Sequence, residues 1–360
     1  MKYINIFLIF ICTCLGFKLK RRHTLSMFDH NWYVIGEANK FSTNIPKKVI
    51  INNSPITVWK DKQNRYSGIL DICPHRGASL SNGRVDKELN CVVCPYHTFK
   101  YSPYGRLVQT PGQKSVRANT KFSYKTDVPY FQIANINNWL YLNNIPIYDI
   151  KNELPCEKSI WVEPEANDDS YRYITISKRF NMDARTVTEN SLDILHISEV
   201  HSFGNKKRPL PVSEKSEKIS DGHYKYTYEY ESGKDSLAYK LFGEKKLIVE
   251  NEYILPHYTV ARVKFGDFVN TVITSALPIN ENETELFVKT YRNNWIYNIP
   301  FIDLIFDEIT KNLMDRTLCE DKAVIENIYP KYKDGNYITK YDDLTQLYRE
   351  DYSNYVNRSN

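Results

Sequence analysis

Residues 73–80 read Cys-Pro-His-Arg-Gly-Ala-Ser-Leu, and residues 94–97 read Cys-Pro-Tyr-His. Each stretch places a thiol and an imidazole close together, Cys73 with His75 and Cys94 with His97, and each follows a strand candidate. Thiolates and imidazoles are ligands that iron accepts. Proline and glycine beside them are typical of tight loops that hold ligand side chains in fixed directions. The two loops therefore predict a metal centre with two cysteine and two histidine ligands.

Two cysteines on one iron and two histidines on the other define the Rieske type of two-iron cluster. The whole block, not the four ligands alone, resembles the Rieske family. There are two departures, since Thr98-Phe99 stands where the family commonly has Gly-Trp, and the spacer between the loops is slightly long. Neither departure removes a ligand, although the loop after His97 is expected to have a different shape. The resemblance implies a [2Fe-2S] cluster bound by Cys73, His75, Cys94 and His97.

The cysteines allow two other interpretations. A zinc site could use Cys73, Cys91, Cys94 and a histidine, and Cys91-Val-Val-Cys94 alone could be a redox pair. Both leave the paired Cys-x-His and Cys-x-x-His loops unexplained. Cys91 is more simply interpreted as a buried strand residue.

Outward from these loops, the chain from Trp32 to about Asn144 consists of short strand candidates separated by turns. Asn-Asn-Ser-Pro at 52–55, between the apolar runs 47–51 and 56–59, is a hairpin signal. Further strand candidates are residues 66–72 and 90–93. We therefore predict an antiparallel β-rich Rieske domain over 30–145, followed by a polar linker over 146–169.

The second half of the chain has a different pattern. Tyrosines at 224, 226, 228 and 230 alternate with polar residues, which is the period-two pattern of a strand with one buried face. Other strand candidates are 247–254, 259–265, 268–276 and 285–291, and helices are expected at 184–199, 301–327 and 342–355. The pattern predicts an α+β protein whose second domain, 170–358, is an antiparallel sheet with covering helices.

A second group of possible metal ligands lies in residues 189–201. Asn190, Asp193 and His196 recur at three-residue steps, which would place them along one side of a helix. His201 is five residues beyond His196, about 140° further around an ideal helix. The helix must therefore loosen or end between the two histidines if both bind one metal ion. Taken alone, such a histidine is as often a hydrogen-bonded core residue as a ligand.

Beside the Rieske loops, this stretch resembles the iron-binding segment of Rieske non-haem iron oxygenases, and the resemblance extends from Trp32 to about Arg358. It implies a helix-grip-like catalytic domain in which two histidines and one carboxylate hold Fe(2+) on one face, leaving positions open for O2. It also implies that His196 and His201 are ligands. Asp193, with Asn190 as a further catalytic residue, would connect the iron to the cluster of a neighbouring subunit in a head-to-tail homotrimer.

The carboxylate ligand is expected far downstream, in the predicted helix 301–327. The candidates are Asp315, Glu320, Asp321 and Glu326. The helical neighbours of Asp321 include Leu318, Val324 and Ile325, whereas those of Asp315 are mixed. A carboxylate turned inward among apolar residues is costly unless it meets a cation. Asp321 is also where the family's third ligand would fall, so we expect Asp321, with Glu320 as second choice.

The resemblance further implies an activity. A ferredoxin or an NAD(P)H-dependent reductase would reduce the cluster, and O2 would be used to oxidise a hydrophobic ring-bearing substrate. The motif spacing and the segment 341–349 look most like the pheophorbide a oxygenase and vanillate-demethylase-like branches, which suggests a chlorophyll catabolite. The alternatives are a sterol desaturase-like oxygenase and a membrane-tethered Rieske electron carrier or redox sensor. A carrier would not need the second domain with its own metal motif.

Charge excludes one class of partner. The chain has 48 Lys and Arg against 43 Asp and Glu, but five basic residues precede the first acidic residue, Asp29. The rest is balanced, and a chain without a basic stripe gives no electrostatic footprint for nucleic acid.

The N-terminus suggests a targeting leader or membrane anchor over residues 1–28. Residues 4–17 are almost entirely apolar, short for a membrane span, and the basic patch 18–22 follows at once. The seven cysteines lack the dense spacing of a disulfide-stapled secreted domain. We therefore expect a membrane-associated or organellar protein, with a plastid as one possibility, whose body lies on the reducing side and is not secreted.

Overall fold

The computed structural model describes residues 31–112, 121–149, 159–201, 206–231, 243, 246–293 and 300–359. The predicted leader at 1–28 lies outside these residues. Among the residues that are described, no helix has the length and apolar character needed to cross a bilayer.

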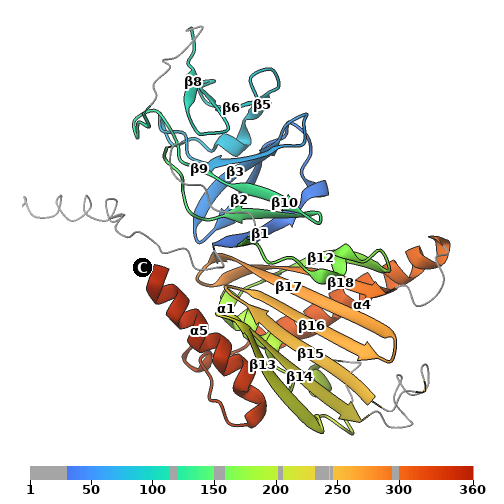
Figure 1. Cartoon of the computed structure of the whole chain (residues 1–360). Helices are drawn as coiled ribbons and strands as arrows, with labels where there is room; N and C mark the ends of the chain where they lie inside the picture. The colour runs from blue at the N-terminus through green and yellow to red at the C-terminus, as the bar shows by residue number, and fades with distance from the viewer. Residues whose placement is uncertain are drawn as a thin grey trace, which may run out of the picture.

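The first part of the chain forms three small antiparallel sheets (Figure 1). One contains β1 (Trp32–Glu37), β11 (Trp139–Asn143) and β10 (Ile133–Ile136); a second contains β2 (Lys47–Ile51), β3 (Ser54–Lys60), β4 (Tyr66–Leu70) and β9 (Tyr130–Phe131); the third contains β5 (Arg84–Asp86), β6 (Cys91–Val93), β7 (Lys100–Tyr101) and β8 (Leu107–Gln109). Asn52 and Asn53 join β2 to β3 with φ angles of 47° and 63°, as a two-residue hairpin turn requires. The predicted hairpin is present.

The second part is a seven-stranded antiparallel sheet with the order β12-β18-β17-β16-β15-β14-β13. Its strands are β12 (Tyr171–Phe180), β13 (Ser213–Ser220), β14 (His223–Glu231), β15 (Lys246–Ile254), β16 (Tyr258–Phe265), β17 (Phe268–Asn280) and β18 (Glu283–Asn293). The helices are α1 (Ala184–Leu192), α2 (Ile197–Val200), α4 (Pro300–Ile325) and α5 (Asp343–Ser359). Single 3-10 turns occur at η1 (Ala38–Lys40), η2 (Leu80–Asn82), η4 (Pro164–Asn167), η5 (Pro330–Tyr332) and η6 (Lys340–Asp342). The predicted α+β class is confirmed.

The helix expected over 184–199 is wrong in one respect, because α1 ends at Leu192. Asp193 has an extended backbone (φ −73°, ψ 121°), and its carboxylate accepts a hydrogen bond from the Leu195 amide at 2.7 Å. Aspartate favours such local bonds over continuing a helix. Asn190, Asp193 and His196 therefore do not share one side of a single helix. His196 instead precedes α2, and His201 follows it.

The two parts of the chain share a core where they meet. Trp32, Val34 and Trp139 of the first part pack with Tyr258 and Ile273 of the seven-stranded sheet. A fully buried ion pair between Lys289 and Glu163 lies at the same junction. Figure 1 shows the result, with the small sheets stacked above the large one and β1 at the boundary.

The buried ion pair joins Lys289 of β18 to Glu163, just before η4. The Lys289 ammonium donates to Glu163 Oε1 at 2.7 Å and to the Asn137 carbonyl, in the β10–β11 turn, at 2.9 Å. It also lies 4.3 Å from the centre of the Trp139 ring. Burial lowers the pKa of Lys289, against the effect of Glu163. One ammonium thus contacts three segments that are distant in the sequence.

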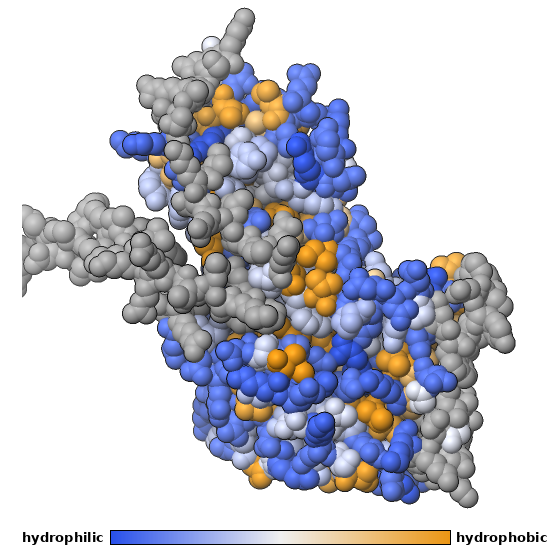
Figure 2. Space-filling model, viewed as in Figure 1, coloured by the Kyte–Doolittle hydropathy of each residue, from blue (hydrophilic) through white to orange (hydrophobic). Residues whose placement is uncertain are grey.

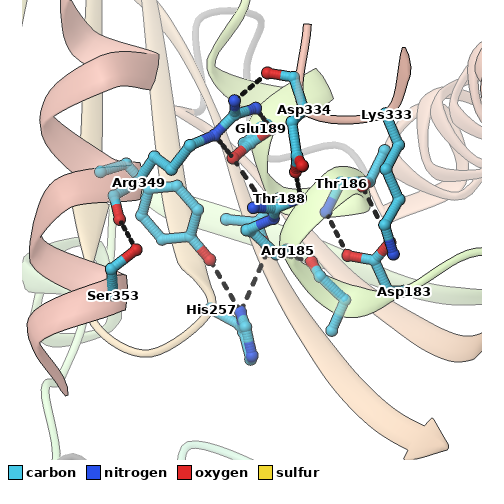
Figure 3. Close-up of polar contacts among 12 residues, drawn as sticks. Asp183, Arg185, Thr186, Thr188, Glu189, His257, Lys333, Asp334, Arg349 and Ser353 are labelled. Atoms are coloured by element: carbon cyan, nitrogen blue, oxygen red, sulfur yellow. Dashed lines mark hydrogen bonds and ion pairs between the residues drawn. The ribbon is translucent and has the colours of Figure 1, made fainter. Parts of the chain in front are cut away.

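Helix α5 holds α1 in place through polar contacts (Figure 3). Arg349 of α5 donates to both carboxylate oxygens of the buried Glu189 in α1, from Nε at 2.7 Å and from Nη2. Tyr348 Oη lies 2.9 Å from Nδ1 of the buried His257. At its other end α1 is capped by Asp183, which accepts from the Thr186 amide at 3.0 Å. The segment that leads to His196 is therefore fixed at both ends.

The surface seen in Figure 2 is mostly hydrophilic over the seven-stranded sheet, with separate groups of apolar residues. The edge strand β13, Ser-Glu-Lys-Ser-Glu-Lys-Ile-Ser, is largely exposed and alternates charge. Charged side chains on an edge strand oppose pairing with another sheet.

We predict that His257 makes stability fall in mild acid. Burial lowers the pKa of His257 to about 3, although Asp183 opposes this, whereas an unfolded histidine titrates near ~6.5. As the pH falls below that value, only the unfolded chain takes up the proton. The free energy of unfolding should therefore drop by about 2 kcal/mol from this residue between about pH 7 and pH 5.

The measurement is urea unfolding of the wild-type protein and of His257→Gln at both pH values. The variant should lose about 2 kcal/mol less stability than the wild type over this interval. An equal pH dependence in the two proteins would contradict the assignment of a neutral buried histidine.

Candidate metal centres

The two Cys/His loops have the same backbone design. In each, the residue four positions after the cysteine donates its amide to the cysteine carbonyl: Gly77 to Cys73 at 2.8 Å, and Thr98 to Cys94 at 3.0 Å. In each, the cysteine amide donates to the residue five positions on, Ala78 or Phe99. The turn places the donor position in the left-handed region, with φ of 71° for Gly77 and 59° for Thr98.

Thr98 is thus a β-branched residue in a conformation that suits glycine. Such residues rarely have positive φ, because the Cβ approaches the following carbonyl. The sequence departure at this position does not change the turn. It leaves backbone strain in the second loop that the first loop avoids.

The four predicted cluster ligands form two pairs. Cys73 and Cys94 are buried, with 2% and 1% exposure, whereas His75 is exposed and His97 is half-buried. The two imidazole rings lie 4.6 Å apart, centre to centre. Burial raises the pKa of the Cys94 thiol, so a thiolate there needs a metal cation beside it. A buried sulfur pair and an outer imidazole pair fit the donor set of a cluster with two cysteines on one iron and two histidines on the other.

Two contacts at this centre were not predicted. The Tyr101 hydroxyl lies 3.2 Å from Cys73 Sγ, and hydrogen bonds to the sulfurs raise a cluster's potential. Phe99 stacks on His75, with ring centres 4.7 Å apart and planes 13° apart. The sequence drew attention to Phe99, because Thr98-Phe99 replaces the family's Gly-Trp. It could not show that the Phe99 ring faces His75. Cys91 stays in β6, where its thiol donates to the Leu89 carbonyl at 3.3 Å.

A second centre forms where α2 meets α4. His196 Nε2 and His201 Nε2 lie 3.4 Å and 3.5 Å from the same atom, Asp321 Oδ1. One donor atom from each of the three residues lies within 4.8 Å of the others. Among the described residues, these three side chains form a group that could hold one metal ion.

The Asp321 carboxylate fits a metal ligand. Its side chain is 11% exposed, and Oδ1 is buried without a hydrogen bond from any described residue. A buried carboxylate is costly unless it meets a cation. Burial lowers the pKa of His196, but the neighbouring Asp193 and Asp321 outweigh it and raise the pKa to about 9. The site therefore attracts positive charge, and two imidazoles with one carboxylate are the donors that Fe(2+) accepts.

The remaining predicted residues lie around this group. Asp193 Oδ2 is 3.4 Å from His196 Nδ1, with the Asp193 side chain 36% exposed. Asn190 lies near the end of α1, and no described hydrogen bond or ion pair joins its side chain to the three converging residues. Glu320, the second choice, contacts His201 Nδ1 at 3.2 Å, on the ring edge away from Asp321.

Two other candidates have different partners. Asp315 is exposed and pairs with Lys178 at 2.6 Å, and Glu326 accepts from the Asn181 amide. Of the four acidic residues considered on α4, Asp321 is the one that converges with both histidines.

Family models match both parts of the chain. Residues 31–125 match the family model of the Rieske [2Fe-2S] domain, and residues 144–295 match that of the 3-ketosteroid 9alpha-hydroxylase C-terminal domain. The computed structure resembles the crystal structure of dicamba monooxygenase bound to dicamba, with a TM-score of 0.73 at 17% identity, covering 93% of this chain and 100% of the other. This likeness confirms the predicted fold.

This chain matches only part of the length of two curated relatives. Pheophorbide a oxygenase, chloroplastic, of Oryza sativa subsp. japonica is 24% identical over 76% of this chain and 50% of the relative. The 5,5'-dehydrodivanillate O-demethylase oxygenase subunit of Sphingobium sp. is also 24% identical, over 55% of this chain and 45% of the relative. The chain thus spans about half the length of these relatives.

We predict that Thr98→Gly stabilises the second loop. Removing the side chain relieves about 1–2 kcal/mol of left-handed strain, and the freer glycine backbone offsets about 0.5–1 kcal/mol of that. The free energy of unfolding should rise by up to about 1.5 kcal/mol. It is measured by urea denaturation, followed through the visible absorption of the cluster.

The matched control is Gly77→Thr at the equivalent position of the first loop, where a Cβ would meet no atom within 4 Å. Gly77→Thr should lower the free energy of unfolding, because the new side chain meets no clash and its only effect is the strain of a threonine at positive φ. A loss of stability in Thr98→Gly would mean that the threonine side chain contributes more than the strain removes.

Proposed function

Because this chain joins a Rieske [2Fe-2S] domain to a 3-ketosteroid 9alpha-hydroxylase-type C-terminal domain, and so belongs to the Rieske non-haem iron oxygenases, we propose that it oxidises a hydrophobic ring-bearing substrate with O2. The cluster ligands are Cys73, His75, Cys94 and His97, and the Fe(2+) ligands are His196, His201 and Asp321. The observation that carries the proposal is the convergence of both Nε2 atoms on the otherwise unbonded Asp321 Oδ1.

The chain's own residues bind and orient the two groups. When bound, the cluster and the iron supply electron transfer and O2 activation. Cys73 and Cys94 lie inside the loops, and His75 reaches the surface, so that the histidine edge is the accessible side for electron exchange. The reductant is a ferredoxin or an NAD(P)H-dependent reductase.

The placement of the two centres favours transfer between subunits. In Figure 1, β6, which precedes the loop with Cys94 and His97, lies at the far end of the first part of the chain, away from α1 and the large sheet. Asp193 combines an exposed edge with a 3.4 Å approach to His196. We propose a head-to-tail homotrimer in which Asp193 connects this centre to the cluster of the neighbouring subunit.

The substrate class is proposed from the relatives. Pheophorbide a oxygenase, by its name, acts on a chlorophyll-derived pigment, and a chlorophyll catabolite is our first choice of substrate. The match of residues 144–295 to a ketosteroid hydroxylase domain favours a sterol as the second candidate. A plastid location fits a chlorophyll catabolite, and a membrane anchor fits a sterol.

Sequencing the mature N-terminus in subcellular fractions separates the two locations, since an intact Met1 in membranes supports the anchor.

We predict that Asp321→Asn abolishes turnover while the cluster remains. The amide lacks the negative charge needed to hold Fe(2+), so substrate-dependent O2 uptake should fall to background. The electron paramagnetic resonance spectrum of the reduced cluster should stay unchanged. The assay supplies ferredoxin, reductase, and panels of tetrapyrroles, sterols and methoxylated aromatic acids.

Asp315→Asn, on the same helix but exposed, serves as the control and should keep wild-type turnover. Full turnover in Asp321→Asn would show that the iron site has been assigned to the wrong residues. If no substrate stimulates O2 uptake although the cluster is intact and reducible, the electron-carrier alternative is favoured.

We also predict complementation between two inactive variants. Cys94→Ser lacks the cluster, and Asp321→Asn lacks the iron, so neither homotrimer should turn over. When the two variants are assembled together in equal amounts, about one quarter of the subunit contacts join a subunit with a cluster to a subunit with an iron site. About one quarter of wild-type activity should therefore return. Size-exclusion chromatography confirms that mixed trimers form. Mixed trimers without activity would mean that transfer stays within one subunit.

A further inference from the structure

Glu320 and Asp321 are neighbours on α4, and both contact the same imidazole. His201, 5% exposed, has its Nδ1 3.2 Å from Glu320 Oε2 and its Nε2 3.5 Å from Asp321 Oδ1. The two carboxylates therefore lie at opposite nitrogens of one ring. Only Asp321 is on the side where His196 Nε2 also points.

The hydrogen bonds of Glu320 distinguish it from a ligand. Its Oε1 accepts from Arg316 Nε at 3.0 Å, and its Oε2 faces His201 Nδ1. Both oxygens thus have partners on the protein. In Asp321, by contrast, Oδ1 accepts no hydrogen bond from the described residues.

The chemistry of imidazole gives this arrangement a consequence. A neutral ring carries one N–H, and the other nitrogen has the lone pair that binds a metal. A carboxylate that accepts from Nδ1 fixes the tautomer with its lone pair on Nε2, sets the ring orientation, and makes the ligand more basic. At His196 the equivalent nitrogen faces Asp193 at 3.4 Å. Both histidines thus share Asp321 on Nε2, but among the described residues only His201 has a hydrogen bond from Nδ1 to a carboxylate.

We propose that Glu320 is a positioning residue for the iron ligand His201, and not the third ligand itself. It accepts the Nδ1 proton of His201 and directs Nε2 toward Asp321 Oδ1. Arg316 is largely exposed, and its role is to occupy the second oxygen of Glu320, so that one oxygen remains for the ring. This inference rests on the proposed iron site at His196, His201 and Asp321.

The test measures metal binding without turnover. Holoprotein with an oxidised cluster is freed of mononuclear iron and titrated anaerobically with Co(II), and the cobalt electron paramagnetic resonance signal is recorded. The oxidised cluster gives no such signal, and its visible absorption reports that each variant is folded. The variants are Glu320→Ala, Glu320→Gln and Asp321→Asn, with Asp315→Asn as the matched control on the exposed face of α4.

Glu320→Ala should weaken Co(II) binding about 10–100-fold and alter the cobalt signal. Glu320→Gln should recover most of the affinity and the wild-type signal, because its amide oxygen can still accept the Nδ1 proton. Asp321→Asn should lose binding, and Asp315→Asn should match the wild type. If Glu320→Ala does not fold, Glu320→Asp serves in its place, since its shorter side chain withdraws the oxygen from Nδ1.

The other outcomes overturn the proposal in distinguishable ways. Wild-type affinity and signal in Glu320→Ala, with binding lost in Asp321→Asn, leaves the iron site in place but removes the positioning role. Loss of binding in Glu320→Gln as complete as in Asp321→Asn makes Glu320 a ligand. Unchanged binding in Asp321→Asn places the metal elsewhere, so that the proposed iron site itself fails.

Discussion

The relative position of the two centres depends on a buried ion pair. Lys289 and Glu163 are both removed from water, so each would be strongly destabilising without the other. Because the same ammonium also bonds the Asn137 carbonyl, the first domain is held on the large sheet in one orientation. That orientation carries β6, which precedes the loop with Cys94 and His97, away from α1. The contacts of this one lysine therefore help to set the arrangement from which we propose electron transfer between subunits.

The proposed iron site combines one continuous helix with an interrupted one. Asp321 is fixed by its position in α4, whereas His196 and His201 flank the short α2 that follows the break at Asp193. The break turns the chain so that both rings reach one oxygen, which a continuous helix would not allow. The Glu320 carboxylate then hydrogen-bonds the outer nitrogen of His201, and the Asp193 carboxylate lies 3.4 Å from the outer nitrogen of His196. Orientation is provided by residues that need not touch the metal.

Many of the strands and helices were predictable, because strands with alternating polarity and hydrophobic helix faces leave strong local patterns. The Tyr224–Tyr230 alternation and the hairpin at Asn52-Asn53 predicted β14 and the β2–β3 turn. The end of α1 was missed, because a single hydrogen bond from Leu195 to Asp193 outweighs an otherwise helical pattern. Sequence could rank Asp321 above Asp315 by its apolar neighbours, and the family resemblance favoured Asp321 over Glu320. It could not assign partners to the two oxygens of Glu320, because these depend on side-chain direction. The sheet order and the Lys289 pair depend on contacts between distant segments.

The contact between Arg349 and Glu189 has a consequence for synthesis of the protein. The two residues are 160 positions apart in the chain. At a translation rate of about 5–20 residues per second, α1 leaves the ribosome roughly 10–30 s before the helix that holds it. During that interval Glu189 has Arg185 of its own helix nearby but lacks Arg349, and the segment leading to His196 lacks the support of α5. Iron acquired by the nascent chain would therefore meet an unformed site, so that loading of the mononuclear metal should follow the docking of α5.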